Sequence, residues 1–190
     1  MATPLVAGAA TVTREYLVKA KGIANPSAAM VKATLLHTAF DMYPGQYGTG
    51  PTQELPTRRP NVHEGYGRVN MDEATNLDSA TILVDERTGV KTGETKSVTE
   101  TVSEGGTLRA TLSYTDAPGA AAAATALVND IDLRVTGPNG FMKELKDRKN
   151  NTEMLELAEL PAGVYQVSVI GINVPLGKAD AQPYALVVSH

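Results

Sequence analysis

The sequence contains no cysteine and no tryptophan, and its three histidines are His37, His63 and His190. Without cysteine no disulfide can form, which is compatible with a cytosolic protein and equally with a secreted bacterial one. None of the histidines stands near a second histidine or a carboxylate at metal-ligand spacing. The sequence therefore supports neither a disulfide framework nor a zinc site.

Strong charge and long apolar runs are also missing. The formal net charge is −4 over 190 residues, and no basic cluster is present. This argues against nucleic acid or an anionic membrane as a partner. No apolar run reaches the roughly 18 residues that a membrane-spanning helix needs, and no signal peptide is visible. The length suits one large domain or two small ones.

The first part of the chain has the periodicity of two helices. Apolar residues recur every three or four positions over 2–20, and Gly22 follows as a stop signal. A cap signal that ends in Ser27 precedes a second apolar segment at 28–39. Positions 41–63 are rich in Gly, Pro and polar residues, so we expect a long loop there.

From about Thr81 the helical spacing gives way to short alternating runs. Polar and apolar residues alternate over 108–114 and 130–135, and residues 185–188 form a fully apolar run. Such runs between turn residues are typical of a β-sandwich or barrel. The alanines at 120–124 favour helix, but their run is short and follows Pro-Gly. We therefore expect a loop or an edge there.

Oxygen-bearing side chains in the second half suggest a calcium site. Asp130 and Asp132 fall on one face of a predicted strand, and Asp116 and Asn151 lie in turns that can converge on it. Other candidates in these turns are Asn129, Asp147 and Asn150. Hard oxygen ligands of this kind are what calcium needs. An ordinary solvated strand face explains Asp-x-Asp as well, so both interpretations stay open.

Two further candidates are weaker. Ser27, His37 and Asp41 suggest a catalytic triad, but Ser27 is better used as a helix-start residue. Nothing in the sequence fixes a nucleophile, a base and an oxyanion hole together, so no catalytic residue is predicted. The basic pair Arg58-Arg59 is either a cleavage point or a solvated loop charge.

Three motifs in the first half resemble subtilisin-like serine proteases. Positions 1–8 read Met-Ala-Thr-Pro-Leu-Val-Ala-Gly, like the stretch after Gly-Thr-Ser in that family. Positions 31–39 fit Val-Lys-x-x-Leu-x-x-Thr-Ala, and 65–70 read Gly-Tyr-Gly-Arg-Val-Asn, like the element closing the catalytic domain. The resemblance implies a nucleophilic serine directly ahead of the first helix. The amides and dipole of that helix would help to hold the oxyanion of acyl transfer.

The second half carries a resemblance of its own. Five stretches are similar to the jelly-roll β-barrel appended to the catalytic domain of oxidation-stable bacterial alkaline proteases: 114–118, 127–140, 150–153, 161–167 and 173–175. Those enzymes are secreted and carry calcium ions, several of them in the β domain. The resemblance therefore implies a secreted parent and strengthens the calcium hypothesis.

Together these patterns predict an α+β chain with two parts. Residues 1–78 would be the C-terminal segment of a subtilisin-like catalytic domain, starting just after the nucleophilic serine position and comprising two helices and a loop. Residues 81–190 would be an all-β jelly-roll or β-sandwich accessory domain. In the family, the first helix packs against a sheet supplied by the preceding catalytic portion. Apolar residues expected to lack that partner are Leu5, Val6, Val12, Leu17, Met30, Val31 and Leu35.

The expected function is that of a C-terminal fragment of a serine endopeptidase. The full-length parent would cleave protein or peptide substrates with Ser, His and Asp, and this chain alone would be inactive because the triad is missing. Exposed N-terminal helices would favour self-association. The alternative is a stand-alone calcium-dependent β-sandwich module for binding or adhesion.

Overall fold

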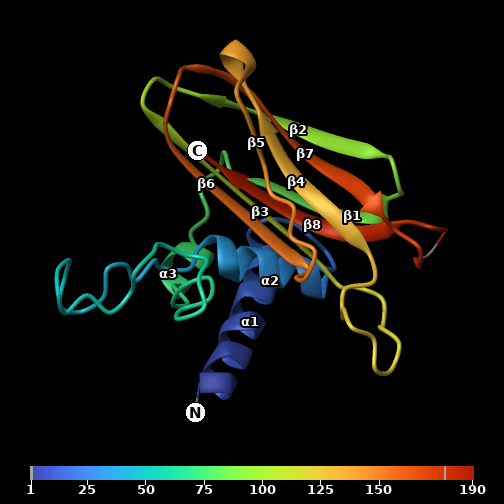
Figure 1. Ribbon diagram of the computed structural model, residues 1–190, viewed down its shortest axis with the longest axis horizontal. Helices are drawn as coiled ribbons and strands as arrows, with labels where there is room; N and C mark the ends of the chain where they lie inside the picture. The colour runs from blue at the N-terminus through green and yellow to red at the C-terminus, as the bar shows by residue number, and fades with distance from the viewer. Residues whose placement is uncertain (1, 178) are drawn as a thin grey trace. The chain divides into compact units, whose positions relative to one another are not determined.

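The computed structural model describes residues 2–177 and 179–190. These residues form mostly β structure together with a few helices (Figure 1). The helices are α1 (Ala2–Lys19), α2 (Ala28–His37), α3 (Met71–Ala74) and the 3₁₀ turn η1 (Pro138–Gly140). The strands are β1 (Ile82–Val90), β2 (Thr95–Val102), β3 (Gly106–Tyr114), β4 (Asp130–Thr136), β5 (Met142–Glu144), β6 (Thr152–Leu160), β7 (Gly163–Asn173) and β8 (Gln182–Ser189). None of the described helices combines the length and apolarity needed to cross a membrane.

Contacts divide the chain into two compact units. One comprises the chain up to Pro26 together with Thr34–Leu77, and the other comprises Ser27–Ala33 together with Asp78–His190. We call them the helical unit and the sandwich unit. The first part of α2 therefore groups with the strands, whereas the last residues of that helix group with the loop that follows it.

Helix α1 follows from the spacing of its apolar residues. The apolar residues Leu5, Ala9 and Leu17, and with them the polar Thr13, stand four residues apart and so share one stripe of the helix. Ala9, Thr13 and Leu17 are buried, whereas Leu5 is 76% exposed. Beyond the last turn Gly22 has a φ of +72°, a conformation that glycine adopts at little cost. The helix predicted over 2–20 is confirmed, but its apolar stripe is covered at one end only.

Helix α2 begins at a side-chain cap. The Ser27 hydroxyl accepts a hydrogen bond from the Met30 amide at 2.9 Å, which satisfies one of the free donors of the first turn. Met30 and Ala33 are fully buried. The cap confirms the role predicted for Ser27. The helix ends at His37, two residues earlier than predicted. Beyond it, the Ala39 amide donates a hydrogen bond to the carbonyl of Leu36, three residues back, and not to that of Leu35.

The sandwich unit consists of two four-stranded sheets. Their strand orders are β1-β8-β3-β6 and β2-β7-β4-β5, and all neighbouring strands run antiparallel. The alternation predicted over 108–114 and 130–135 is found as β3 and β4. In the register, Leu112 lies opposite Leu186 of β8 and Glu153 of β6. The expectation of a β-sandwich is therefore correct.

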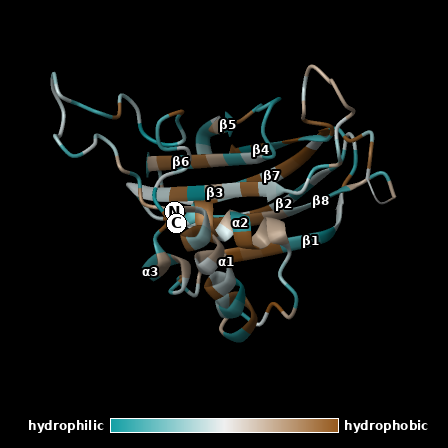
Figure 2. Ribbon diagram, turned by 90° about the horizontal axis from the view of Figure 1, so that it is seen from below, coloured by the Kyte–Doolittle hydropathy of each residue, from teal (hydrophilic) through white to brown (hydrophobic). Residues whose placement is uncertain are grey.

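The core of this unit lies between the two sheets. Period-two alternation directs one set of side chains from each strand inward, and hydrophobic segments recur along the strands of both sheets (Figure 2). The buried set includes Leu108, Leu112, Tyr114, Ile131, Leu133, Val135, Tyr165, Val167, Leu186 and Val188. Since these residues are nearly all aliphatic or tyrosine, hydrophobic burial stabilises the unit without disulfides.

Two long loops join regular elements of the chain. Residues 117–128 lie within the connection from β3 to β4, and Ala120–Ala124 form no strand or helix, as expected. The long loop of the helical unit starts after Phe40 and returns at Arg68. These two residues exchange both backbone hydrogen bonds, at 2.7 and 2.9 Å, and therefore close the base of the loop.

Candidate functional site

Asp130 and Asp132, the centre of the calcium hypothesis, are paired with an arginine. Nη1 of Arg148 lies 2.8 Å from Oδ1 of Asp130, and it also contacts Oδ1 of Asp132. Nη2 of Arg148 donates to Oδ2 of Asp132 at 3.1 Å. The guanidinium therefore stands where the hypothesis would put a cation.

The acidic face of β4 is not a solvated face. Asp132 is 0% exposed, and Asp130 is also buried. Burial raises the pKa of Asp130, Arg148 lowers it, and the neighbouring Asp132 raises it further. The interpretation of Asp-x-Asp as a solvated face is therefore wrong for Asp132, because the turn that carries Arg148 covers this part of the strand.

Glu153 completes the cluster, although nothing in the sequence singled it out. Its carboxylate accepts the Leu133 amide at 2.6 Å and the Asp147 amide at 2.8 Å. Burial raises the pKa of Glu153 to about 7. The two amide hydrogen bonds lower this pKa, but their effect is smaller than that of burial. Because Glu153 belongs to β6 and Leu133 to β4, one side chain connects an edge strand of one sheet to a strand of the other.

The other predicted ligands have different partners. The Asp116 carboxylate accepts the amides of Val128 and Asn129 at 2.7 and 2.9 Å. Asn151 donates to the Tyr114 carbonyl at 2.9 Å and accepts from Lys32 at 2.9 Å. Asp116 thus holds a loop and Asn151 is occupied on both of its amide atoms, while Asp130 and Asp132 share Arg148.

These positions bear directly on the calcium hypothesis. Within residues 2–177 and 179–190, no group of three or more His, Asp or Glu side chains is arranged to hold a metal ion. The residues that come nearest to the chemistry calcium needs are Asp130 and Asp132, and Arg148 already neutralises them in part. Calcium binding by this chain stays a prediction.

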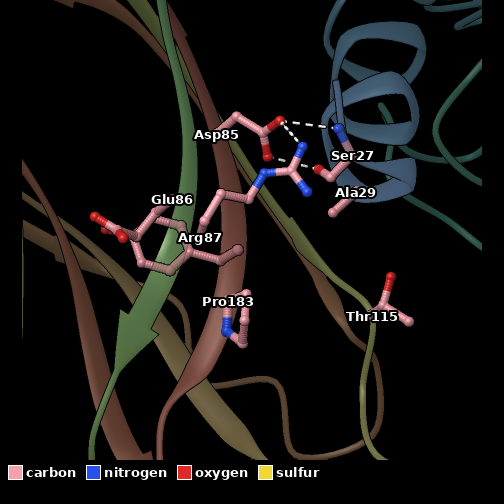
Figure 3. Close-up of a pocket in the computed structure, with 8 residues that line it drawn as sticks. Ser27, Ala29, Asp85, Glu86, Arg87, Thr115 and Pro183 are labelled. Atoms are coloured by element: carbon pink, nitrogen blue, oxygen red, sulfur yellow. Dashed lines mark hydrogen bonds and ion pairs between the residues drawn. The ribbon is translucent and has the colours of Figure 1, made fainter. Parts of the chain in front are cut away.

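A small pocket of about 210 Å³ lies elsewhere in the sandwich unit. Figure 3 shows its polar end, where the Asp85 carboxylate faces Ser27 and the guanidinium of Arg87. Asp85 accepts the Ser27 amide at 2.8 Å and the Ser27 hydroxyl at 2.6 Å, and it pairs with Arg87 at 2.7 Å. The rest of the lining consists of Ala29, Glu86, Thr115, Pro183 and Tyr184.

The polar groups of this pocket have a structural role: Asp85 of β1 fixes the start of α2 through Ser27. The Ser27 hydroxyl donates a hydrogen bond to Asp85 and accepts one from the Met30 amide, so its only O–H is already engaged. No histidine belongs to the described lining, and a serine needs a general base to act as a nucleophile. On the other side of the pocket, burial would raise the pKa of Glu86, but hydrogen bonds from Thr88 and the ion pair with Lys96 lower it to about 2.

The remaining members of the rejected triad also have other partners. Asp41 accepts the Tyr43 amide at 3.0 Å and pairs with Arg58 at 2.9 Å. Arg58 also lies over the Tyr43 ring, 5.0 Å from its centre. His37 is buried. The rejection of Ser27, His37 and Asp41 as a triad is therefore supported by the hydrogen bonds of Ser27 and Asp41.

The basic pair is split between two environments. Arg58 is exposed and paired with Asp41, whereas Arg59 is only 6% exposed. Arg59 donates to the carbonyls of Ala39 and Tyr66, which lie at the two ends of the long loop. The hypothesis of a solvated charge fits Arg58 but is wrong for Arg59, because the loop folds back over its guanidinium.

Comparisons with known proteins give one relative of interest. The serine protease/ABC transporter B family protein tagA of Dictyostelium discoideum is 24% identical over 188 aligned residues, which cover 86% of this chain and 10% of that protein. This chain thus spans about a tenth of the relative's length. No family model matches the chain.

Solved structures resemble the chain only loosely. A protein from Sulfurospirillum deleyianum, known from a crystal structure, is 10% identical with a TM-score of 0.32. The aligned region covers 57% of this chain and 94% of that protein's chain. The Yersinia pseudotuberculosis-derived mitogen is 12% identical, with a TM-score of 0.27, and covers 51% of this chain and 86% of its own. Similarity at this level says nothing about function.

Proposed function

We propose that this chain is the C-terminal part of a subtilisin-like serine endopeptidase. The proposal rests on the three ordered motifs of residues 1–8, 31–39 and 65–70, and a relative named as a serine protease supports it. In the parent, a serine, a histidine and an aspartate would cleave peptide bonds by acyl transfer. This chain would supply the helix behind the nucleophile and an accessory domain.

The structural feature that most supports the proposal is the exposed start of α1. The motif residues Ala2 to Gly8 are all exposed, and Leu5 and Val6 are 76% and 44% exposed. The first amides of a helix have no partners within it, so they present partial positive charge. A helix end of this kind can hold the oxyanion that forms beside a nucleophilic serine. The uncovered apolar side chains suit packing against further protein.

The third motif supports the proposal through its backbone. Gly67 has a φ of +102°, and a Cβ there would collide with the Phe40 carbonyl. Only glycine allows this approach, which brings Arg68 into its bridge with Phe40. The spacing of the motif thus has a structural reason: it closes the long loop on itself. An element that closes the catalytic domain is what the resemblance implies here.

The second unit supports the role of an accessory domain. Eight strands in the orders β1-β8-β3-β6 and β2-β7-β4-β5 suit a jelly roll, the topology of the domain that follows the catalytic domain in the resembling enzymes. Its contribution would be to stabilise the enzyme. Secretion of the parent is part of the same proposal.

The alternative of a calcium-dependent binding module has less support. It needs Asp130 and Asp132 to be available to the ion, and both are hydrogen-bonded to Arg148. The protease proposal needs no such rearrangement of the described residues, so we favour it.

The proposal is tested by reading the genomic DNA ahead of the first codon. We expect an in-frame Gly-Thr-Ser followed directly by Met-Ala-Thr-Pro, with aspartate and histidine motifs further upstream. A stop codon in frame just ahead of the first codon would overturn the proposal. A second test uses the protein itself. A fluorophosphonate probe should label the extended polypeptide and leave this chain unlabelled, because the probe reacts with an activated serine.

A further inference from the structure

The loop at 117–128 of the sandwich unit has an unusual composition. Residues 119–126 read Gly-Ala-Ala-Ala-Ala-Ala-Thr-Ala, and every one of them is exposed. No charged or bulky side chain interrupts this run. The loop therefore offers a stretch of small, uncharged side chains to the solvent.

Both ends of the loop are held by one side chain. Asp116 accepts the Ala117 amide at 2.8 Å at one end. At the other end it accepts the amides of Val128 and Asn129. Gly119 lies so close to the Ala126 carbonyl that a Cβ there would be 3.1 Å from it. The loop thus has a narrow, fixed neck.

The interior of the loop is held by very little. Between Pro118 and Leu127 the described structure has one internal hydrogen bond, from the Ala123 amide to the Ala120 carbonyl at 3.1 Å. Ala122 has a φ of +62°, which costs energy for a residue with a Cβ. An endopeptidase binds its substrate as an extended segment, so it cuts where a segment opens at low cost. This loop can open without breaking the neck.

The long loop of the helical unit is built differently. Arg59 is buried and donates hydrogen bonds to carbonyls at both ends of this loop. The residue that follows Arg59 in the sequence is Pro60. Glu54 accepts the Gln46 amide, and the Asn61 side chain accepts the amides of His63 and Glu64. Opening this loop would break these contacts, so length alone does not make it the first place to be cut.

We infer that loop 117–128 is the first cleavage site of the folded chain for an endopeptidase that accepts small uncharged side chains. In the step, water adds to one peptide carbonyl between Gly119 and Ala126 and the C–N bond breaks. The oxygen of the water enters the new carboxylate, and the nitrogen leaves as an amine. The inference stands independently of the proposed function.

The sandwich unit stays assembled after this cut. The neck lies between the cut and the strands, so the bonds of Asp116 to Ala117, Val128 and Asn129 remain. β3 stays paired with β6 and β8, and β4 stays paired with β5 and β7. The new charged ends lie in solvent, where they cost little.

Limited digestion of the full chain with an elastase-type protease tests the inference, because the specificity pocket of such proteases accepts small residues. At a low protease ratio, mass spectrometry should find the first cut between residues 119 and 126. The two pieces should elute together in native size-exclusion chromatography. A first cut in any other segment, or pieces that separate without denaturant, would overturn the inference.

Two variants separate recognition from simple mobility. Ala120→Asp combined with Ala122→Asp and Ala124→Asp should slow the elastase cut about tenfold or more, the effect of misfit groups at a specificity pocket. Ala121→Lys should create a new cut by a trypsin-type protease in the same loop. Melting temperatures close to that of the wild type would show that both variants fold, as expected for changes in an exposed loop. A triple variant cut as fast as the wild type would contradict the assigned specificity.

Discussion

Glu153 on β6 accepts the backbone amide of Leu133 on β4 at 2.6 Å. The two residues belong to different sheets, so this hydrogen bond ties the layers of the sandwich together at one edge. The second oxygen of Glu153 accepts the Asp147 amide and so fixes the turn that carries Arg148. One carboxylate therefore organises the side of the unit on which Asp130 and Asp132 lie.

Replacing Glu153 by alanine should lower the free energy of unfolding by roughly 2 kcal/mol or more, because two amides would lose their acceptor away from water. Urea denaturation measures the change. The matched control is Glu156→Ala on the same strand, which removes a half-exposed ion pair with Arg109 and should cost less than about 1 kcal/mol. Equal losses in the two variants would contradict the assigned role of Glu153.

The stability of the chain should depend on pH through the same carboxyl. Burial raises the pKa of Glu153 from its usual 4.5 to about 7, so the folded state holds this proton more tightly than the unfolded state does. Its contribution to stability is complete below the unfolded value and is lost as the pH rises through about 7. Unfolding free energies measured from about pH 5 to about pH 8 should therefore decrease. Glu153→Gln, which has no proton to lose, should flatten that part of the curve, and parallel curves for the two proteins would rule out this origin.

Ser27 is expected to stabilise the start of α2. Ser27→Ala removes the acceptor of the Met30 amide and a donor to Asp85, and it should cost about 1 kcal/mol. Thermal unfolding followed by circular dichroism measures the loss. Ser79→Ala is the control, because Ser79 is exposed and makes only a long contact with Asp78, and it should change the melting temperature little. A loss of melting temperature in the control as large as that in Ser27→Ala would contradict the stabilising role assigned to Ser27.

Arg148 and calcium should compete for Asp130 and Asp132. Arg148→Gln removes the guanidinium from both carboxylates, so calcium should raise the melting temperature of this variant more than that of the wild type. Calorimetric titration with calcium of chelator-treated protein provides an independent measure. Adding Asp132→Asn to the variant should abolish the effect. The absence of heat and of any thermal shift in all three proteins would eliminate the calcium hypothesis.

The exposed end of α1 should make the chain associate with itself. Leu5 and Val6 are largely uncovered and no charged residue lies between Ala2 and Thr13, so nothing in this half of the helix opposes contact between apolar faces. Light scattering should show a mass that rises with concentration. Leu5→Lys should reduce the association, and Thr11→Lys on the exposed surface of the same helix serves as the control. A monomer at all concentrations would refute the expectation.

Local patterns were sufficient for much of the fold. The spacing of apolar residues such as Leu5, Ala9 and Leu17 predicts α1, the cap residue Ser27 predicts where α2 starts, and alternation predicts β3 and β4. These features depend on neighbours within a few positions. Of the residues expected to lack a partner, Leu5, Val6 and Val12 are exposed, whereas Leu17, Met30, Val31 and Leu35 are buried in the described structure.

The sequence placed Asp130 and Asp132 together, but it could not predict that Asp132 is buried or that Glu153 takes part. Glu153 and Glu156 occupy one strand and look alike as residues, yet one is buried and the other pairs near the surface. The environments of the two residues differ because β4 and the turn at Arg148 pack against Glu153. Contacts of this kind depend on how the strands come together in the fold. The same long-range packing buries Asp132, which an isolated strand would leave in water.

The bridge between Phe40 and Arg68 makes the segment it encloses a suitable place for insertions. Two backbone hydrogen bonds fix the stem whatever the length of the enclosed chain, and each doubling of a flexible loop adds only about 0.6 kcal/mol of closure entropy. Gly48 and Gly50 lie within this segment, and, the adjacent residues aside, no other heavy atom lies within 4 Å of the position that a Cβ would take at either glycine. An epitope or a fluorescent label inserted between them would be displayed without disturbing the stem.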